Sequence, residues 1–202
     1  MDKDNVNKSG NLISYLVVFF IALYFANKMI PGPSSKPVDF SKAILTEQNI
    51  RIALKNEVLQ VIPSDHSFPA DIIKINIKDN PDVTGQKDIE IFFEPEFWDE
   101  THLVKIVGGT MIKVGKTLFI NPEIETITLL AVVDMVNKYG QSSKQIGVKI
   151  KLSRQLASKV NWAGLAEYHT LDPGNIYRLA DDYLINPGIA RFLNWAEINF
   201  DN

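Results

Sequence analysis

The feature that most constrains this chain is an apolar run close to its N-terminus. The stretch Leu12–Ala26 contains no charged residue, and Lys28 is the only one before Ile30. About 19 residues therefore approach the ~20 that cross a hydrocarbon core. We predict a tail over 1–10 and a transmembrane helix over 11–30. A cleaved signal peptide and a buried helix are the alternatives, although no convincing small-residue cleavage site follows the run.

The composition excludes several classes of protein. There are 21 Lys and Arg residues against 24 Asp and Glu residues, with no clustered basic surplus, which argues against nucleic acid as a partner. The chain has no cysteine and three histidines, so disulfides and thiolate zinc sites are excluded. We expect no zinc or other cofactor. No Ser/His/Asp arrangement, phosphate loop or dinucleotide fingerprint occurs in the sequence.

The rest of the chain divides by composition. Residues 31–39 contain three prolines with Gly and Ser, which is typical of a semi-extended spacer. Residues 40–86 are interpreted as an accessory region with a helix and a strand, and residues 87–202 as the main domain. The helix is expected between Phe40 and Ile62, although part of this stretch could be a strand. Strict alternation of Ile with polar residues predicts a strand over 71–78.

The main domain is predicted to be α+β, with a small antiparallel sheet backed by one long helix and preceded by the transmembrane helix. A hairpin turning at Gly115 is expected over 110–123, followed by a helix over 121–140 that opens with Asn121-Pro122-Glu123. Residues 145–153 alternate as a core strand, residues 154–184 are expected to be irregular with helical pieces, and residues 195–200 are expected to form a terminal strand.

The order of these elements resembles the zinc D-alanyl-D-alanine carboxypeptidase and L-alanyl-D-glutamate endopeptidase family, including phage endolysins. The segments that carry the resemblance are "FFEPEF", "INPEIETITLLAVVDMVNKYG", "VKIKLSRQ", "NIYRLADD" and "GIARFLNWAEINFD". They cover about 88–201, over half of the chain. The resemblance implies a peptidoglycan peptidase whose zinc is held by a Ser-x-His-x-x-Gly-x-Ala-x-Asp motif and a histidine of the last strand.

The chain departs from that family at the metal ligands. The motif aspartate falls on Asp182, but its histidine falls on Asn175 and the last-strand histidine falls on Glu197. An oxygen-only set is a poor zinc site and suits a hard cation better, if any. The resemblance therefore implies a vestigial metal site at Asn175, Asp182 and Glu197 and no catalytic residue. His169 could serve as a substitute ligand, and each position could equally be an ordinary solvated side chain.

Arg154 follows the core strand at the position where the family has an arginine after its Ser-Gly-Tyr segment. It is a candidate contact for a carboxylate of a peptide substrate, or it pairs with an acidic residue such as Asp181 or Glu167. Only this arginine and Ser153 match that family segment.

Three functions remain open from the sequence. The first is a membrane-anchored pseudoenzyme of the bacterial envelope, or of a bacteriophage virion, that acts as a structural or cell-wall-binding module. The second is an active metallopeptidase that cleaves peptidoglycan stem peptides. The third is an envelope assembly or scaffold protein with a partner-binding domain. The predicted location is the bacterial inner membrane with the domain in the periplasm, or the internal membrane of a virion, and the predicted partners are the bilayer, through Leu12 to Ile30, and peptidoglycan or other envelope or virion proteins.

Overall fold

The computed structural model describes residues 39–57, 71–137, 139–168 and 175–198, which belong to one compact unit, Val38–Asn202. The predicted tail, transmembrane helix and spacer lie outside these residues. Within the described part of the chain, no helix has the length and apolar character needed to cross a bilayer. The elements are η1 (Phe40–Lys42), α2 (Glu47–Glu57), β1 (Ile72–Asp79), β2 (Lys87–Phe93), α3 (Glu100–Leu118), β3 (Ile124–Val136), β4 (Ser142–Ser153), α4 (Arg154–Ala157), α5 (Trp162–Tyr168), α6 (Asn175–Leu179), β5 (Asp182–Ile185), α7 (Pro187–Ala190) and α8 (Trp195–Ile198).

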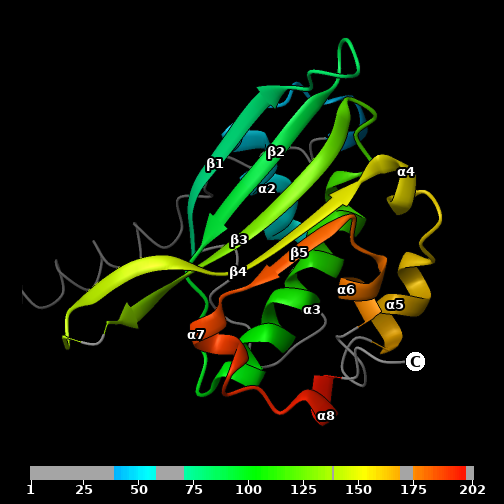
Figure 1. Cartoon of the computed structure of the whole chain (residues 1–202). Coiled ribbons are helices and arrows are strands. Elements are labelled where there is room, and N and C mark those ends of the chain that lie inside the picture. The colour runs from blue at the N-terminus through cyan, green and yellow to red at the C-terminus, as the bar shows by residue number, and fades with distance from the viewer. Residues whose placement is uncertain (1–38, 58–70, 138, 169–174, 199–202) are drawn as a thin grey trace, which may run out of the picture. The chain divides into compact units, whose positions relative to one another are not determined.

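The strands form one five-stranded sheet in the order β1-β2-β3-β4-β5 (Figure 1). The α+β class is therefore confirmed, but the sheet is mixed rather than antiparallel, because β2 and β3 run parallel. The other three pairs are antiparallel. Parallel neighbours need a long crossover connection, and α3 supplies it here.

The segment predicted as a hairpin at Gly115 is instead part of the long helix α3, so that prediction is wrong. Buried apolar side chains recur there at helical spacings, and the carboxylate of Asp99 caps the first turn by accepting from the backbone N–H of His102 at 2.7 Å. Two-residue alternation is absent, which decides against strands. The buried apolar residues of α3 are Leu103, Val104, Val107, Met111, Ile112, Val114 and Leu118.

The segment predicted as the long helix is the strand β3, so that prediction is also wrong. Its apolar residues fit a helical spacing, but Ile, Thr and Val are abundant and β-branched side chains favour a pleated surface. Ile127, Leu129 and Ala131 are fully buried and point to the helices. Asn121 and Pro122 lie in the turn before this strand.

Most of the remaining predictions of helices and strands are confirmed, in full or in part. The strands over 71–78 and 145–153 are confirmed as β1 and β4. The helix over 40–62 is confirmed in part by α2, and the helical pieces over 154–184 by α4, α5 and α6. The predicted terminal strand is wrong, because the described residues 195–198 form the short helix α8.

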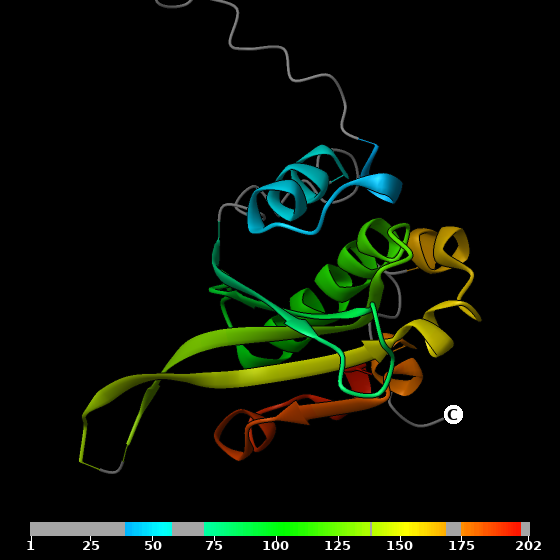
Figure 2. The same ribbon diagram turned by 90° about the horizontal axis from the view of Figure 1, so that it is seen from above.

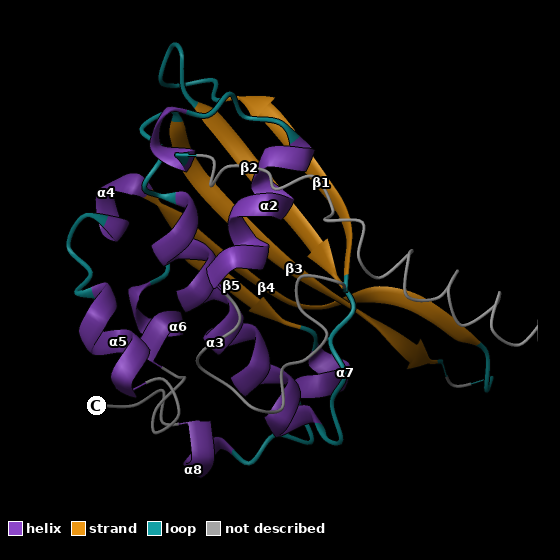
Figure 3. Cartoon of the chain, turned by 180° about the vertical axis from the view of Figure 1, so that it is seen from behind, coloured by secondary structure: helices purple, strands orange, loops and turns teal. Residues whose placement is uncertain are grey.

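The helices α2 and α3 cover one face of the sheet, as the views from the front and from behind show (Figures 1 and 3). Ile91, Leu129 and Ile150 lie in one row of that face and are fully buried. On the opposite face the register aligns Asn76, Glu90, Thr128, Lys151 and Asp182. The sheet thus separates an apolar face under helices from a polar face, which we call the open face.

Candidate functional site

The structure places Asp182 at the start of the edge strand β5, on the open face of the sheet. Its Oδ2 accepts from Lys149 Nζ at 2.6 Å. That hydrogen bond is the main reason why the pKa of Asp182 lies below its usual value. The side chain is 53% exposed, so this carboxylate is part of a solvated cross-strand ion pair.

Asn175 lies at the first residue of α6, and its Oδ1 accepts from the guanidinium of Arg178 one turn later. Among the described residues, no hydrogen bond or ion pair joins Asn175 to Asp182. The described residues contain no group of three His, Asp or Glu side chains that could hold a metal ion. His169 and the side chain of Glu197 lie outside the described residues, so their roles stay predictions.

The α8 segment and the start of β5 lie toward opposite ends of α3. The backbone N–H of Asn194, just before α8, donates to Thr101 in the first turn of α3 at 3.0 Å. Asp181 Oδ1 accepts from the hydroxyl of Ser153 at 3.0 Å. Arg154, which follows Ser153 in the chain, donates to the carbonyl of Phe119 just after the last turn of α3 at 3.3 Å. At 1.5 Å per residue, the two ends of α3 that these contacts reach are roughly 25 Å apart.

Arg154 has a structural role that its contacts define. Its guanidinium donates to the carbonyls of Phe119 at 3.3 Å, Asn121 at 2.5 Å and Ile124 at 2.7 Å. These carbonyls belong to the end of α3 and the start of β3, and that of Asn121 also accepts from the backbone N–H of Ile124 at 3.3 Å. Burial lowers the pKa of Arg154, although a guanidinium stays charged. Its predicted contact with a substrate carboxylate stays a prediction.

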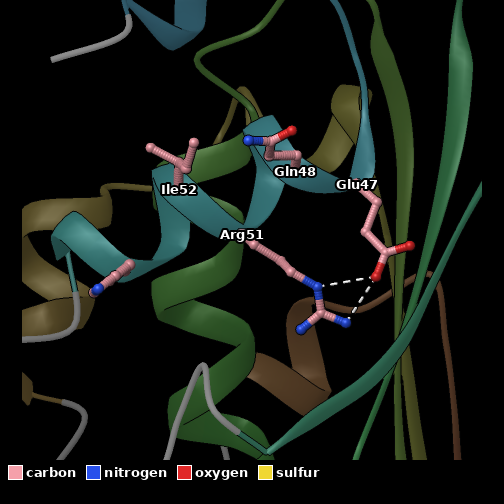
Figure 4. A pocket seen from close by; sticks show the side chains of 5 residues that line it. Glu47, Gln48, Arg51 and Ile52 are labelled. Carbon is pink, nitrogen blue, oxygen red and sulfur yellow. Dashed lines mark hydrogen bonds and ion pairs between the residues drawn. The ribbon is translucent and has the colours of Figure 1, made fainter. Parts of the chain in front are cut away.

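A shallow depression of about 500 Å³ lies over α2. Figure 4 shows the side chain of Arg51 turned toward Glu47, whose carboxylate oxygen it contacts at 2.8 Å. Nε and Nη2 of Arg51 both donate to Glu47, and the remaining nitrogen, Nη1, donates to the carbonyl of Ile72 at 3.0 Å. The guanidinium therefore joins α2 to the first strand, and this depression brings together no set of groups typical of catalysis. Its lining residues are Glu47, Gln48, Arg51, Ile52 and Lys55.

The most distinctive surface is a projecting hairpin formed by β3 and β4. The strand β2 pairs with β3 only as far as Ala131, and β5 pairs with β4 only from Val148. Beyond these points β3 and β4 still pair with each other to their tips, and they run out past the sheet (Figures 1 and 2). We call residues 132–147 the ribbon.

The base of the ribbon is held by α7. Gly147 has no side chain, and a Cβ there would lie 2.8 Å from Ile189 Cδ1 and 2.7 Å from Val133 Cγ2. Val133 and Ile189 are 6% and 5% exposed. The ribbon therefore has a packed base, whereas Val136 near its tip is 68% exposed.

A charged pair crosses the ribbon on the open face. Lys144 of β4 lies opposite Asp134 of β3, and its Nζ contacts Glu94 Oε1 at 2.5 Å. The hydrogen bond with Glu94 raises the pKa of Lys144. Lys144 therefore lies close to two carboxylates, those of Glu94 and Asp134.

Sequence reasoning missed the ribbon because it assigned 121–140 to a helix. A signal was present, since the turn at 137–141 lies between two segments rich in Val and Ile. Gly140 has φ 78°, which lies in the left-handed region that favours glycine. A turn containing this glycine, with Val132, Val133 and Val136 before it and Ile146, Val148 and Ile150 after it, is typical of a hairpin.

Comparison with known proteins gave no relatives. No family model, curated protein or solved structure matches this chain.

Proposed function

We propose that this protein is a membrane-tethered assembly module of the bacterial envelope, or of an internal virion membrane, whose α+β domain binds a partner protein. The observation that supports the proposal is the ribbon, which leaves the sheet with no further strand beside it among the described residues. A two-stranded ribbon is marginally stable in water by itself and presents unpaired backbone groups to other chains. Such an element is suited to docking rather than to catalysis.

The predicted membrane anchor also supports a role in assembly. The apolar run over 12–30 and the proline-rich spacer would hold the domain close to one bilayer surface, where its partners are restricted to proteins of the same envelope. The resemblance to peptidoglycan peptidases remains a prediction. Nothing among the described residues supports the metallopeptidase alternative, since the described carboxylate of Asp182 pairs with Lys149.

The test is photo-cross-linking of the full chain in the membranes of its native host. A photoreactive side chain replaces Tyr139, which is 75% exposed at the ribbon tip. The matched control replaces Val83, which is 39% exposed in the turn between β1 and β2. We expect one discrete envelope or virion protein to be captured from the tip and not from the control. Equal capture at both positions, or capture at neither, would contradict the proposal.

Peptidoglycan binding is the second candidate, and a separate surface favours it. The guanidinium of Arg191 lies 4.7 Å from the ring centroid of Phe192, which is 59% exposed. Trp195, three residues later, is 51% exposed. Aromatic faces can stack on sugar rings, and a guanidinium can bind the carboxylates of stem peptides.

Co-sedimentation of the full chain with purified sacculi tests this candidate. We expect Phe192→Ala to reduce the bound fraction, whereas Phe97→Ala, at a 39% exposed position before α3, should leave it unchanged. A chain that stays in the supernatant would remove wall binding and leave the assembly proposal standing.

A further inference from the structure

The edge of the ribbon formed by Val132–Val136 differs from the two outer edges of the sheet. The outer strand β1 carries Lys74 and Lys78, and charged side chains of this kind discourage pairing with other strands. The opposite outer strand, β5, is only four residues long. The ribbon edge is five residues long, contains no lysine, arginine or proline, and has Asp134 as its single charged residue.

This edge opens where β2 ends. Phe93 is the last residue of β2 that pairs with β3, and the N–H of Glu94 already donates to the carbonyl of Asp71 instead. Pro95 follows and has no N–H to donate, so the chain cannot continue the ladder. Beyond Phe93, the side of β3 that β2 occupied is vacant among the described strands. A strand from another chain could continue the line of β2 there.

The ribbon is held in a form that can accept such a strand. On the helix side, Val133 packs beside Ile189 of α7, and a Cβ at Gly188 would lie 2.4 Å from Met135 Cε. These contacts fix one face of the edge, so the backbone of β3 is positioned before any partner arrives. Preorganisation of this kind lowers the entropic cost of binding.

Charge indicates the chemistry of the incoming strand. On the open face, Glu94 directly follows Phe93, the partner of Ala131, and therefore lies beside the start of the edge. Asp134 lies two residues beyond Val132 on β3, and Glu96 is exposed nearby in the chain. The cation that faces the two carboxylates is Lys144, and it is already bonded to Glu94. A strand with basic side chains on this face would meet unbalanced negative charge. Its apolar side chains would point to the other face, where Val133 and Met135 lie beside α7.

We propose that the edge of β3 from Val132 to Val136 binds an extended peptide segment with alternating basic and apolar residues as a sixth strand of the sheet. This inference rests on the proposed assembly function and names the chemistry of the partner. Backbone hydrogen bonds provide the general affinity, and Glu94 and Asp134 select cationic side chains.

The binding test uses the full chain in detergent and a fluorescent acetyl-Lys-Val-Lys-Val-Lys amide, titrated by fluorescence anisotropy. Two comparison peptides are needed: one with Glu in place of Lys, and one N-methylated at every residue, so that no backbone N–H can pair with β3 in either register. We expect the basic peptide to bind, with affinity that falls as salt rises. The acidic and N-methylated peptides should bind at least about tenfold more weakly, because each lacks one of the two determinants.

The protein variants locate the site. Asp134→Asn should weaken binding about threefold, as expected for one exposed charge pair, and Asp134→Lys about tenfold or more. Asp82→Asn changes an exposed carboxylate in the turn between β1 and β2 and should leave binding unchanged. Circular dichroism of each variant checks that the fold is intact.

Several outcomes would overturn the inference. Equal binding of the N-methylated peptide would exclude strand pairing, and equal binding of the acidic peptide would exclude charge selection. Cross-links between two copies of the chain through 132–136 would show that a second copy fills the edge. If the ribbon tip captures a native partner but the basic peptide does not bind, this inference fails and the assembly function stands. If the peptide binds but no native partner is captured, the site stands and the assembly function fails.

Discussion

Single residues of this chain carry roles that depend on contacts far away in the sequence. Asn121 is 1% exposed, and its side-chain amide donates to the carbonyls of Phe40 at 3.0 Å and Ala43 at 2.9 Å. The amide thereby ties η1 to the turn that precedes β3. These bonds matter because a buried amide group is costly to leave unpaired.

Gly115 provides the sharpest prediction at this scale. A Cβ at this position would lie 2.5 Å and 2.9 Å from two ring atoms of Trp162 in α5. Alanine improves helix propensity by about 1 kcal/mol, but overpacking against a rigid ring costs typically 1–3 kcal/mol. We therefore expect Gly115→Ala to lower the free energy of unfolding of the full chain by about 1 kcal/mol, measured by thermal and chemical denaturation.

Trp162→Leu provides the partner variant for a double-mutant cycle. If the ring is the obstacle, Gly115→Ala should cost less in the Trp162→Leu background than in the wild type. A purely additive pair of effects would show that the contact does not limit the packing of α3 against α5.

Arg154 provides a second prediction. Lysine keeps the charge but cannot reach three diverging carbonyls with one ammonium group. We expect Arg154→Lys to lower the melting temperature, with a loss of about 1–3 kcal/mol, because hydrogen bonds to charged groups are worth more than neutral ones and the site is partly exposed.

Arg191→Lys is the matched control, since Arg191 is exposed and stacks only on Phe192 among the described contacts. If Arg154→Lys leaves stability unchanged, its carbonyl contacts are dispensable, and the substrate-contact prediction would gain weight.

Elements of secondary structure show how far local patterns determine this fold. The isoleucine alternation of β1 and the alternation in β4 suffice to identify both strands, because each has one apolar face and one polar face. In contrast, the local pattern predicts a hairpin over 110–123, where the second half of α3 lies, and a helix over 121–140, where β3 lies. α3 contains Gly108 and Gly109 in its interior, which weakens its helical signal, and β3 is apolar on both sides at Leu129 and Leu130, which hides its alternation.

The open face of the sheet gives a prediction for pH dependence. Glu90 of β2 accepts from Lys78 at 2.7 Å and from Asn76 at 2.8 Å, and these bonds lower the pKa of Glu90 from its usual value near 4.5. A carboxyl whose folded pKa is depressed stabilises the fold above its unfolded pKa, and this contribution is lost as pH falls through the folded pKa. We expect Glu90→Gln to lower stability at pH 7 by less than about 1 kcal/mol, because the site is close to the surface.

The same variant should reduce the loss of stability below about pH 4.5, measured by urea denaturation at several pH values. Asp79→Asn, on a more exposed carboxylate that contacts Lys87, is the control. An unchanged acid dependence in Glu90→Gln would mean that other carboxyls dominate it.

At the scale of the whole molecule, the predicted transmembrane helix over 11–30 would restrict the domain to a membrane surface. We predict that the full chain stays in the membrane pellet after alkaline carbonate extraction, because about 19 apolar residues would cost too much free energy to expose to water. A chain that lacks residues 1–37 should move to the supernatant. Release of the full chain by carbonate would contradict the predicted transmembrane helix.

The candidate site also illustrates what depends on the whole molecule. The vestigial metal site was predicted from residues near in sequence, but α3 separates the α8 region from the start of β5 along its length. The ribbon edge is formed because β2 stops at Phe93 while β3 continues to Val136. The local sequence of one strand does not show how far its partner strand extends, so the open edge could not be predicted from sequence patterns.

Composition and local periodicity suffice for the α+β class, the strands β1 and β4, the exclusion of cysteine chemistry and the expectation of a membrane tether. Packing in three dimensions was needed to assign one apolar segment to the helix and the other to the strand. Either segment could bury its apolar residues as a helix or as a strand, and the choice follows from its neighbours: β3 lies between β2 and β4 in the sheet, and α3 forms the crossover connection from β2 to β3.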